Sequence, residues 1–188
     1  MAQAHKPIYA WGSPHCQGYA YVDAHEALKA CLRDTVHYVR CATPLEDRVC
    51  VAGDSMWSYN AGLVYRAFAR AEALRVAPYW DAPPVVLRYL KTGDAHLQEP
   101  ARAAIESAIP TSYGACPSLS GIPEAIDAAA TAIDARPRGW IVAYNVVTYI
   151  EQGARKSTAM WARSRHMGRR LAAYLTAGRR TYGQRVVP

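Results

Sequence analysis

A serine in a Gly-Asp-Ser turn is the first residue of this sequence whose setting suits covalent chemistry. Gly53, Asp54 and Ser55 follow an apolar run. A nucleophilic serine needs a histidine base that is itself held by an aspartate. The nearest such pair is Asp94 and His96, with one residue fewer between them than in a D-x-x-H arrangement. Because the chain between them is too short to build a parallel sheet, we interpret Asp54 or Ser55 as a helix cap.

Metal and phosphate chemistry find little support in the spacing of the other polar residues. His5, His15, Cys16 and His25 lie close together in the sequence, but not at the spacing of a known metal site. Neither G-x-x-x-x-G-K-[ST] nor G-x-G-x-x-G occurs. We therefore expect no catalytic residue, no cofactor and no metal, and a protein that is not an enzyme.

The cysteines are odd in number and never form a C-x-x-C pair, so they do not suggest a disulfide framework or a zinc ribbon. Reduced, mostly buried thiols in an intracellular compartment are the expectation. The five are Cys16, Cys31, Cys41, Cys50 and Cys116.

The composition indicates one folded domain with a hydrophobic core. The chain has 188 residues, of which 51% are hydrophobic and 20% charged, and this excludes wholesale disorder. There are 13 tyrosines and 5 tryptophans but a single phenylalanine. Such a bias suits protein interfaces, where a ring meets a polar partner at one end. No apolar run approaches the ~18 residues of a membrane span, and no transit peptide is visible.

Positive charge is concentrated at the C-terminal end. Glu151 is the last acid, and the residues after it carry a charge of +9, against −2 for the rest of the chain. This predicts a surface for RNA, acidic lipid or an acidic protein, with a solvated helix face and a basic tail as the alternative. The candidate partner-binding residues are Arg163, Arg165, Arg169 and Arg170.

We predict three segments: an extended, irregular arm over 1–22, a helical domain over 23–178 and a basic tail over 179–188. Helix signals dominate the middle segment. Asp23 with Glu26 forms a capping box for a helix from residue 24 to about 40. The run 48–52 could be a short strand, but we interpret it as the approach to a helix over 57–74.

Prolines and glycines delimit three further predicted helices. Pro84 opens one that Gly93 closes, and a second begins at Gln98 and stops before Pro110. A third follows Ser120, continues to Ile133 and ends before Pro137.

A helical hairpin over 138–170 is the strongest pattern in the chain. Its first helix is apolar on every side, with Trp140, Tyr144 and Val147 on one face, which predicts burial of all three. Gly153 breaks this helix, and an amphipathic second helix follows.

The hairpin resembles a pentatricopeptide repeat. That family has a Tyr-Asn pair, a turn glycine and a late Met-Gly, and Tyr144-Asn145, Gly153 and Met167-Gly168 stand in that order here. A second pair, Tyr59-Asn60, precedes it. The resemblance implies an all-α array of degenerate helical hairpins. Its repeat-core residues would be Tyr59, Asn60, Trp140, Tyr144, Asn145 and Val147.

Sequence-specific RNA reading is not expected from such repeats. The family reads bases with a polar residue just after Tyr-Asn, but this chain has Ala61 and Val146 there, and Ala115 after a weaker pair. RNA contact without sequence preference remains possible through the basic end.

Three segments also resemble the pentatricopeptide-like subunit on the α subunit of the euglenozoan mitochondrial ATP synthase head. They are residues 6–12, 26–31 and 57–60, in the expected order. The resemblance implies a non-catalytic structural subunit on the matrix side of mitochondria, with the ATP synthase α subunit as partner. The alternative is a mitochondrial RNA-binding pentatricopeptide protein.

Overall fold

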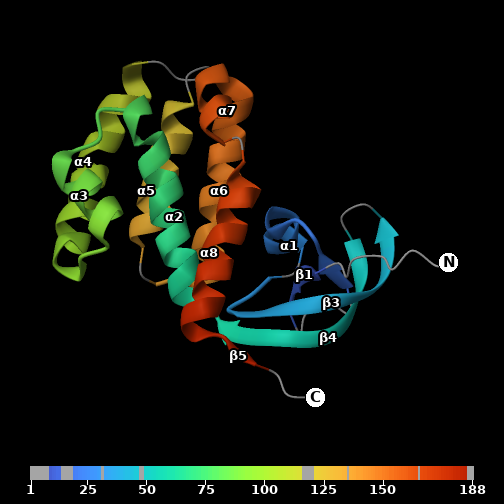
Figure 1. Cartoon of the computed structure of the whole chain (residues 1–188). Coiled ribbons are helices and arrows are strands. Elements are labelled where there is room, and N and C mark those ends of the chain that lie inside the picture. The colour runs from blue at the N-terminus through green and yellow to red at the C-terminus, as the bar shows by residue number, and fades with distance from the viewer. Residues whose placement is uncertain are drawn as a thin grey trace. The chain divides into compact units, whose positions relative to one another are not determined.

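The computed structural model describes residues 9–13, 19–30, 32–46, 49–115, 121–134, 136–164 and 166–185 (Figure 1). The chain forms two compact units. The first, here called the sheet unit, combines Met1–Val64 with Gly168–Pro188, and the second, the helical unit, is Tyr65–Met167. The sheet unit therefore joins both ends of the chain.

The sheet unit contains an antiparallel sheet in the order β2-β1-β3-β4-β5. An additional β2–β4 pairing closes β1, β2, β4 and β3 into a ring. β5 pairs with β4 at Trp57 and Ser58, whereas β2 pairs with β4 at the other end. The strands are β1 (Tyr9–Gly12), β2 (Tyr19–Tyr21), β3 (Thr35–Glu46), β4 (Val49–Asn60) and β5 (Gln184–Arg185).

Small residues fill the ring of strands. Ala10, Ala20, Val39 and Cys50 form its buried cluster. β3 and β4 shift register repeatedly along their length, and such irregularities bend paired strands enough to close a sheet over so small a core.

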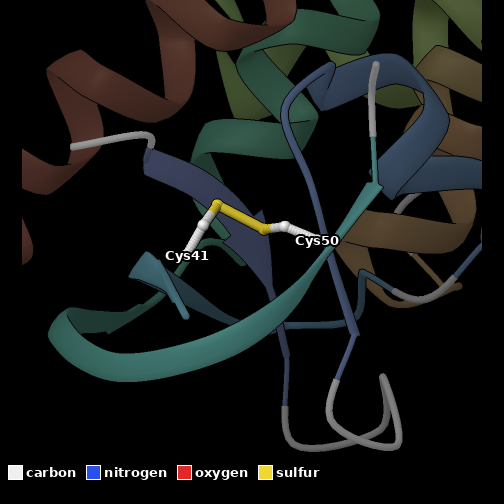
Figure 2. Close-up of a disulfide and its surroundings, with 2 residues drawn as sticks. All are labelled: Cys41 and Cys50. Atoms are coloured by element: carbon white, nitrogen blue, oxygen red, sulfur yellow. A yellow bond between two sulfur atoms is a disulfide. The ribbon is translucent and has the colours of Figure 1, made fainter. Parts of the chain in front are cut away.

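A disulfide links Cys41 of β3 to Cys50 of β4, with 5.7 Å between their Cα atoms (Figure 2). The expectation of reduced thiols is therefore wrong for this pair, because the β3–β4 hairpin brings together two cysteines that show no recognisable spacing in sequence. Cys16, Cys31 and Cys116 lie outside the described residues.

Helix α1 (Ala24–Ala30) begins where the capping box predicts. The Asp23 carboxylate accepts the backbone N–H groups of His25 at 2.7 Å and Glu26 at 3.3 Å. The helix ends about ten residues earlier than expected, since Thr35 already belongs to β3.

Helix α8 (Met167–Tyr182) belongs to the sheet unit from Gly168 onward and packs against the strands of that unit. The Tyr59 hydroxyl donates to the Leu175 carbonyl at 2.7 Å, and the Arg179 guanidinium lies 4.6 Å from the ring centre of Tyr38. A second ring, that of Trp57, lies 5.9 Å from the same guanidinium. These contacts attach the C-terminal helix to β3 and β4 through hydrogen bonding and cation–π attraction.

The helical unit consists of successive helices. α5 buries seven of its twelve residues, so it is the central helix of this unit. No described helix is long and apolar enough to cross a membrane. The helices are most of α2 (Gly62–Val76), η1 (Ala77–Tyr79), α3 (Pro84–Thr92), η2 (Ala95–Leu97), α4 (Gln98–Ala115), α5 (Ile122–Ile133), α6 (Gly139–Lys156) and α7 (Thr158–Ser164).

Local signals place several of these helix ends correctly. α3 begins at Pro84 and ends at Gly93, whose φ of 67° is left-handed, as predicted. α5 ends at Ile133, also as predicted. Two predicted breaks are wrong, because α4 continues past Pro110 and α6 continues past Gly153. A Cβ atom on Gly153 would lie 3.2 Å from the Glu124 Cβ, so this glycine allows close packing rather than a turn.

The predicted all-α array of repeats is wrong. The predicted irregular arm contributes β1 and β2, and residues 49–52 lie in β4 together with Tyr59 and Asn60. Burial within the predicted hairpin is also only partly right. Val147 is fully buried, Trp140 is half-buried and Tyr144 is 36% exposed. α6 therefore has one partly exposed side. Because the residues on that side are aromatic, the sequence pattern predicted a helix that is buried all round.

Candidate functional site

Ser55 has a histidine partner, but not the one that sequence spacing suggests. In the sheet unit, Ser55 Oγ lies 2.9 Å from Nδ1 of His37, across the β3–β4 pairing. Asp94 and His96 instead belong to the helical unit, where the Asp94 carboxylate accepts the backbone N–H of His96 at 3.0 Å. Spacing could not reveal His37, because strand pairing brings it to Ser55 from 18 residues away.

The His37–Ser55 pair has part of the chemistry of a nucleophile and its base. Burial lowers the pKa of His37, so the imidazole is neutral at pH 7 and able to accept the serine proton. In the described part of the chain, however, no carboxylate hydrogen-bonds His37 to orient its ring. Among the described residues, the pair therefore has no third member of the kind that activates a serine nucleophile.

Of the other sequence candidates for metal binding, only His25 lies in the described residues. Within the described residues, no group of three His, Cys, Asp or Glu side chains could hold a metal ion. His25 follows the cap of α1, while His5, His15 and Cys16 lie outside the described residues.

A polar concavity lies in the helical unit, between α4, α5 and α6. Its volume is about 370 Å³, which is within the range of small-molecule sites. Apolar side chains such as Ile105 and Ile133 share its wall with acids, arginines and hydrogen-bonding groups. It is lined by Arg102, Ile105, Glu106, Asp127, Ala130, Thr131, Ile133, Asp134, Arg136, Pro137, Asn145 and Tyr149.

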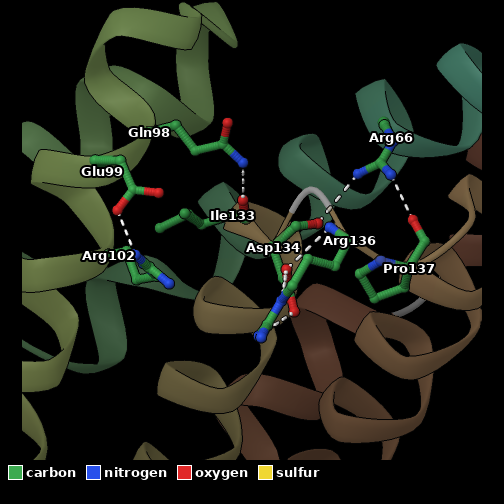
Figure 3. A network of polar contacts seen from close by, with 8 residues as sticks. All are labelled: Arg66, Gln98, Glu99, Arg102, Ile133, Asp134, Arg136 and Pro137. Carbon is green, nitrogen blue, oxygen red and sulfur yellow. Dashed lines mark hydrogen bonds and ion pairs between the residues drawn. The ribbon is translucent and has the colours of Figure 1, made fainter.

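A polar network closes the C-terminal end of α5 beside this concavity (Figure 3). Gln98 Nε2 donates to the Ile133 carbonyl at 2.7 Å. Arg66 donates to the Asp134 carbonyl at 3.1 Å and to the Pro137 carbonyl. These side chains satisfy carbonyls that a helix end leaves without helical partners, so the network is a structural cap.

Both arginines at the concavity have carboxylate partners. Arg136 bonds both carboxylate oxygens of Asp134 at 3.0 Å, and this interaction holds the pKa of Asp134 below its usual value. Arg102 pairs with Glu99 one turn away on α4. Since each arginine already has a carboxylate partner, neither offers the concavity a concentrated positive charge.

A second hollow, of about 440 Å³, lies in the sheet unit and is lined by Thr35, Ser58, Tyr59, Asn60 and Tyr182. Tyr59 is buried there, and burial raises the pKa of its phenol well above the ordinary value. Asn60 is exposed and its Oδ1 accepts the backbone N–H of Gly62 at 2.9 Å. The predicted repeat pair Tyr59-Asn60 thus lines a hollow at the end of two strands.

The other predicted repeat-core residues lie in the helical unit, on α6. Asn145 is half-buried and lines the polar concavity, whereas Val147 belongs to the core. Trp140 and Tyr144 are the partly exposed residues of the set.

The four predicted partner-binding arginines are divided between the two units. Arg163 lies on α7 in the helical unit, and its side chain is outside the described residues, as is all of Arg165. Arg169 and Arg170 lie on α8 in the sheet unit, exposed and half-buried respectively. Arg180, near the end of α8, is a further exposed arginine.

Comparisons with protein-family models, with curated proteins and with solved structures give no match.

Proposed function

We propose that this protein is a non-catalytic subunit that binds an acidic surface of another protein in a large mitochondrial assembly. The observation that carries the proposal is helix α8, which contains four arginines and no acid. Arg169 and Arg180 are exposed eleven residues apart, or roughly 16 Å along a helix. Exposed positive charge on a helix favours docking onto a complementary negative surface.

The catalytic head of the ATP synthase is the first assembly to test, with its α subunit as the partner. Support comes from the order of the segments 6–12, 26–31 and 57–60, which resemble the extra subunit described above. The repeat architecture no longer supports it, since residues 57–60 lie in a strand. The proposal therefore depends on sequence resemblance and charge.

Purification from the source cells in mild detergent, with mass spectrometry of comigrating proteins, tests this assignment. Stoichiometric recovery with ATP synthase α and β subunits is the expected result. The double variant Arg169→Glu/Arg180→Glu should lose the comigration, while Arg88→Glu on α3, also an exposed arginine, should keep it. Recovery of the protein alone, or with ribosomal or RNA-processing proteins, would refute the ATP synthase assignment.

The disulfide bears on the compartment. A reducing matrix ordinarily keeps cysteine pairs as thiols, whereas Cys41 and Cys50 are bonded in this structure. Trapping of free thiols in intact cells, followed by mass spectrometry of the peptides that contain Cys41 and Cys50, shows whether the pair is reduced or bonded. Modification of both cysteines fits a matrix protein, and protection of both places the protein in an oxidising compartment.

A further inference from the structure

The hollow of the sheet unit has the chemistry of a nucleobase site. It lies where β3 begins and β4 ends, and Tyr182, the last residue of α8, forms part of its wall. Its volume is about 440 Å³. Two tyrosines and three small polar side chains line it. Single-stranded nucleic acids are bound by such combinations of an aromatic face and nearby hydrogen-bonding groups.

Tyr182 supplies the aromatic face. Its side chain is 53% exposed although it lines the hollow, so a large part of the ring is accessible to a ligand. The ring of Tyr59 is only 7% exposed, and its hydroxyl is engaged with the Leu175 carbonyl. Tyr59 therefore forms a fixed wall, and Tyr182 is the ring on which a base could stack.

The polar side chains at the hollow offer both donors and acceptors. Asn60 uses its Oδ1 to hold Gly62 N–H, which leaves its Nδ2 able to donate to a ligand. Thr35 lies opposite Asn60 in the β3–β4 register, and Ser58 is two residues before it on β4. These groups can hydrogen-bond the edge of a base without selecting strongly among bases.

Positive charge lies next to the hollow along the chain. Arg180 is exposed two residues before Tyr182, on a helix without acids. Residues two apart on a helix do not share a face, so Arg180 lies beside the hollow rather than in its wall. A phosphate of the strand that leads away from the stacked base would meet this cation, as in other sites for single strands.

We propose that the hollow lined by Thr35, Ser58, Tyr59, Asn60 and Tyr182 binds an unstacked base of a single-stranded nucleic acid, with Arg180 contacting the adjacent phosphate. This site does not depend on the proposed docking of α8 to a protein. It also needs no pentatricopeptide code, and it predicts binding with little sequence preference.

The test is fluorescence anisotropy of the full chain with fluorescein-labelled single strands of about eight nucleotides, the site size of one small binding unit. Oligo(rU), oligo(rA) and oligo(dT) serve as probes at physiological salt. Tyr182→Ala should weaken binding by about 5- to 100-fold, the usual effect of removing one stacking ring, while Tyr182→Phe should stay within about twofold. Arg180→Ala should flatten the dependence of log Kd on log salt by about 0.7 unit, the value for one phosphate contact on a single strand.

The matched control is Tyr144→Ala, which removes a tyrosine that is 36% exposed in the helical unit and should leave binding unchanged. A thermal melt of each variant establishes that it is folded. Equal binding by Tyr182→Ala and Tyr144→Ala, or no binding by the parent protein, would overturn the proposal. Loss with Arg180→Ala alone would also overturn it, since that result indicates phosphate contact without a base site. Equal affinity for RNA and DNA indicates recognition of base and phosphate only, whereas a preference for RNA adds a contact with the 2′-hydroxyl.

Discussion

The interactions that stabilise the sheet unit connect residues far apart in the sequence, whereas those that stabilise the helical unit connect segments that are close in the sequence. In the helical unit, α3, α4, α5 and α6 follow one another and pack mainly against near neighbours. In the sheet unit, Tyr59 bonds Leu175 across 116 residues, and β5 at the C-terminal end completes pairing with β4. The difference implies that the sheet unit needs both chain ends, whereas the helical unit is built from one continuous segment.

Removal of the C-terminal segment should produce the largest difference in folding between the two units. A chain that ends at Met167 lacks α8 and β5, and thereby the buried Leu171 and Leu175. We expect the sheet unit to lose its fold, because α8 also accepts the Tyr59 hydroxyl at the Leu175 carbonyl and places Gly178 against Tyr59 and Val64. Limited proteolysis with mass spectrometry should show rapid cleavage within 1–64 and protection of 65–167. Equal protection of both segments would contradict the contrast between the units.

A core substitution in the helical unit should have the next largest effect. Phe68 is fully buried, so Phe68→Ala should reduce the free energy of unfolding by about 3–5 kcal/mol. Trp140→Ala should cost less, since Trp140 is half-buried and not a core residue. Urea denaturation followed by circular dichroism measures both. A larger loss for Trp140→Ala would mean that α6 is buried more completely than described.

Loss of the disulfide should affect the sheet unit alone. Cys41 and Cys50 are nine residues apart, and closing a loop of this size stabilises a fold by about 2–3 kcal/mol. The variant Cys41→Ser/Cys50→Ser should therefore show faster hydrogen exchange at β3 and β4, with α5 and α6 unchanged. Exchange that rises equally in both units would show that they unfold together.

The smallest effect concerns the buried hydroxyl of Tyr59. Tyr59→Phe removes its hydrogen bond to the Leu175 carbonyl and should cost about 1 kcal/mol at pH 7. Burial raises the pKa of this phenol above its unfolded value of 10.0, so the folded state retains a proton that the unfolded state loses. Stability should consequently fall as pH rises above 10 in the parent protein, and fall less steeply in Tyr59→Phe. Parallel curves for the two proteins would show that Tyr59 does not couple to folding.

Local signals and long-range pairing explain which parts of the structure were predictable. The cap at Asp23, the start of α3 at Pro84 and its end at Gly93 follow from backbone preferences of single residues. Residues 24–39 carry an apolar stripe of helical spacing, but Thr35 to Val39 are also β-branched or aromatic and suit a strand. Only their pairing with β4 decides between the two.

Some features of the candidate sites can likewise be read from local sequence, and others depend on long-range pairing. The acid-free basic end is visible in the sequence, because charge does not depend on the fold. The His37–Ser55 pair is not visible, since strand register places the two side chains together. The hollow beside Tyr182 needs both chain ends in one unit, so its lining residues share no sequence pattern.

The sequence by itself determined the helices between residues 84 and 156 in large part, their caps, and the uneven distribution of charge. These depend on interactions within a few residues, which composition and spacing record. The tertiary structure alone decided that residues 9–12, 19–21, 35–46 and 49–60 form a sheet, that Cys41 meets Cys50, and that α8 returns to contact β4. The physical reason is that a strand has no hydrogen-bond partners of its own and is stabilised only when a distant segment supplies them.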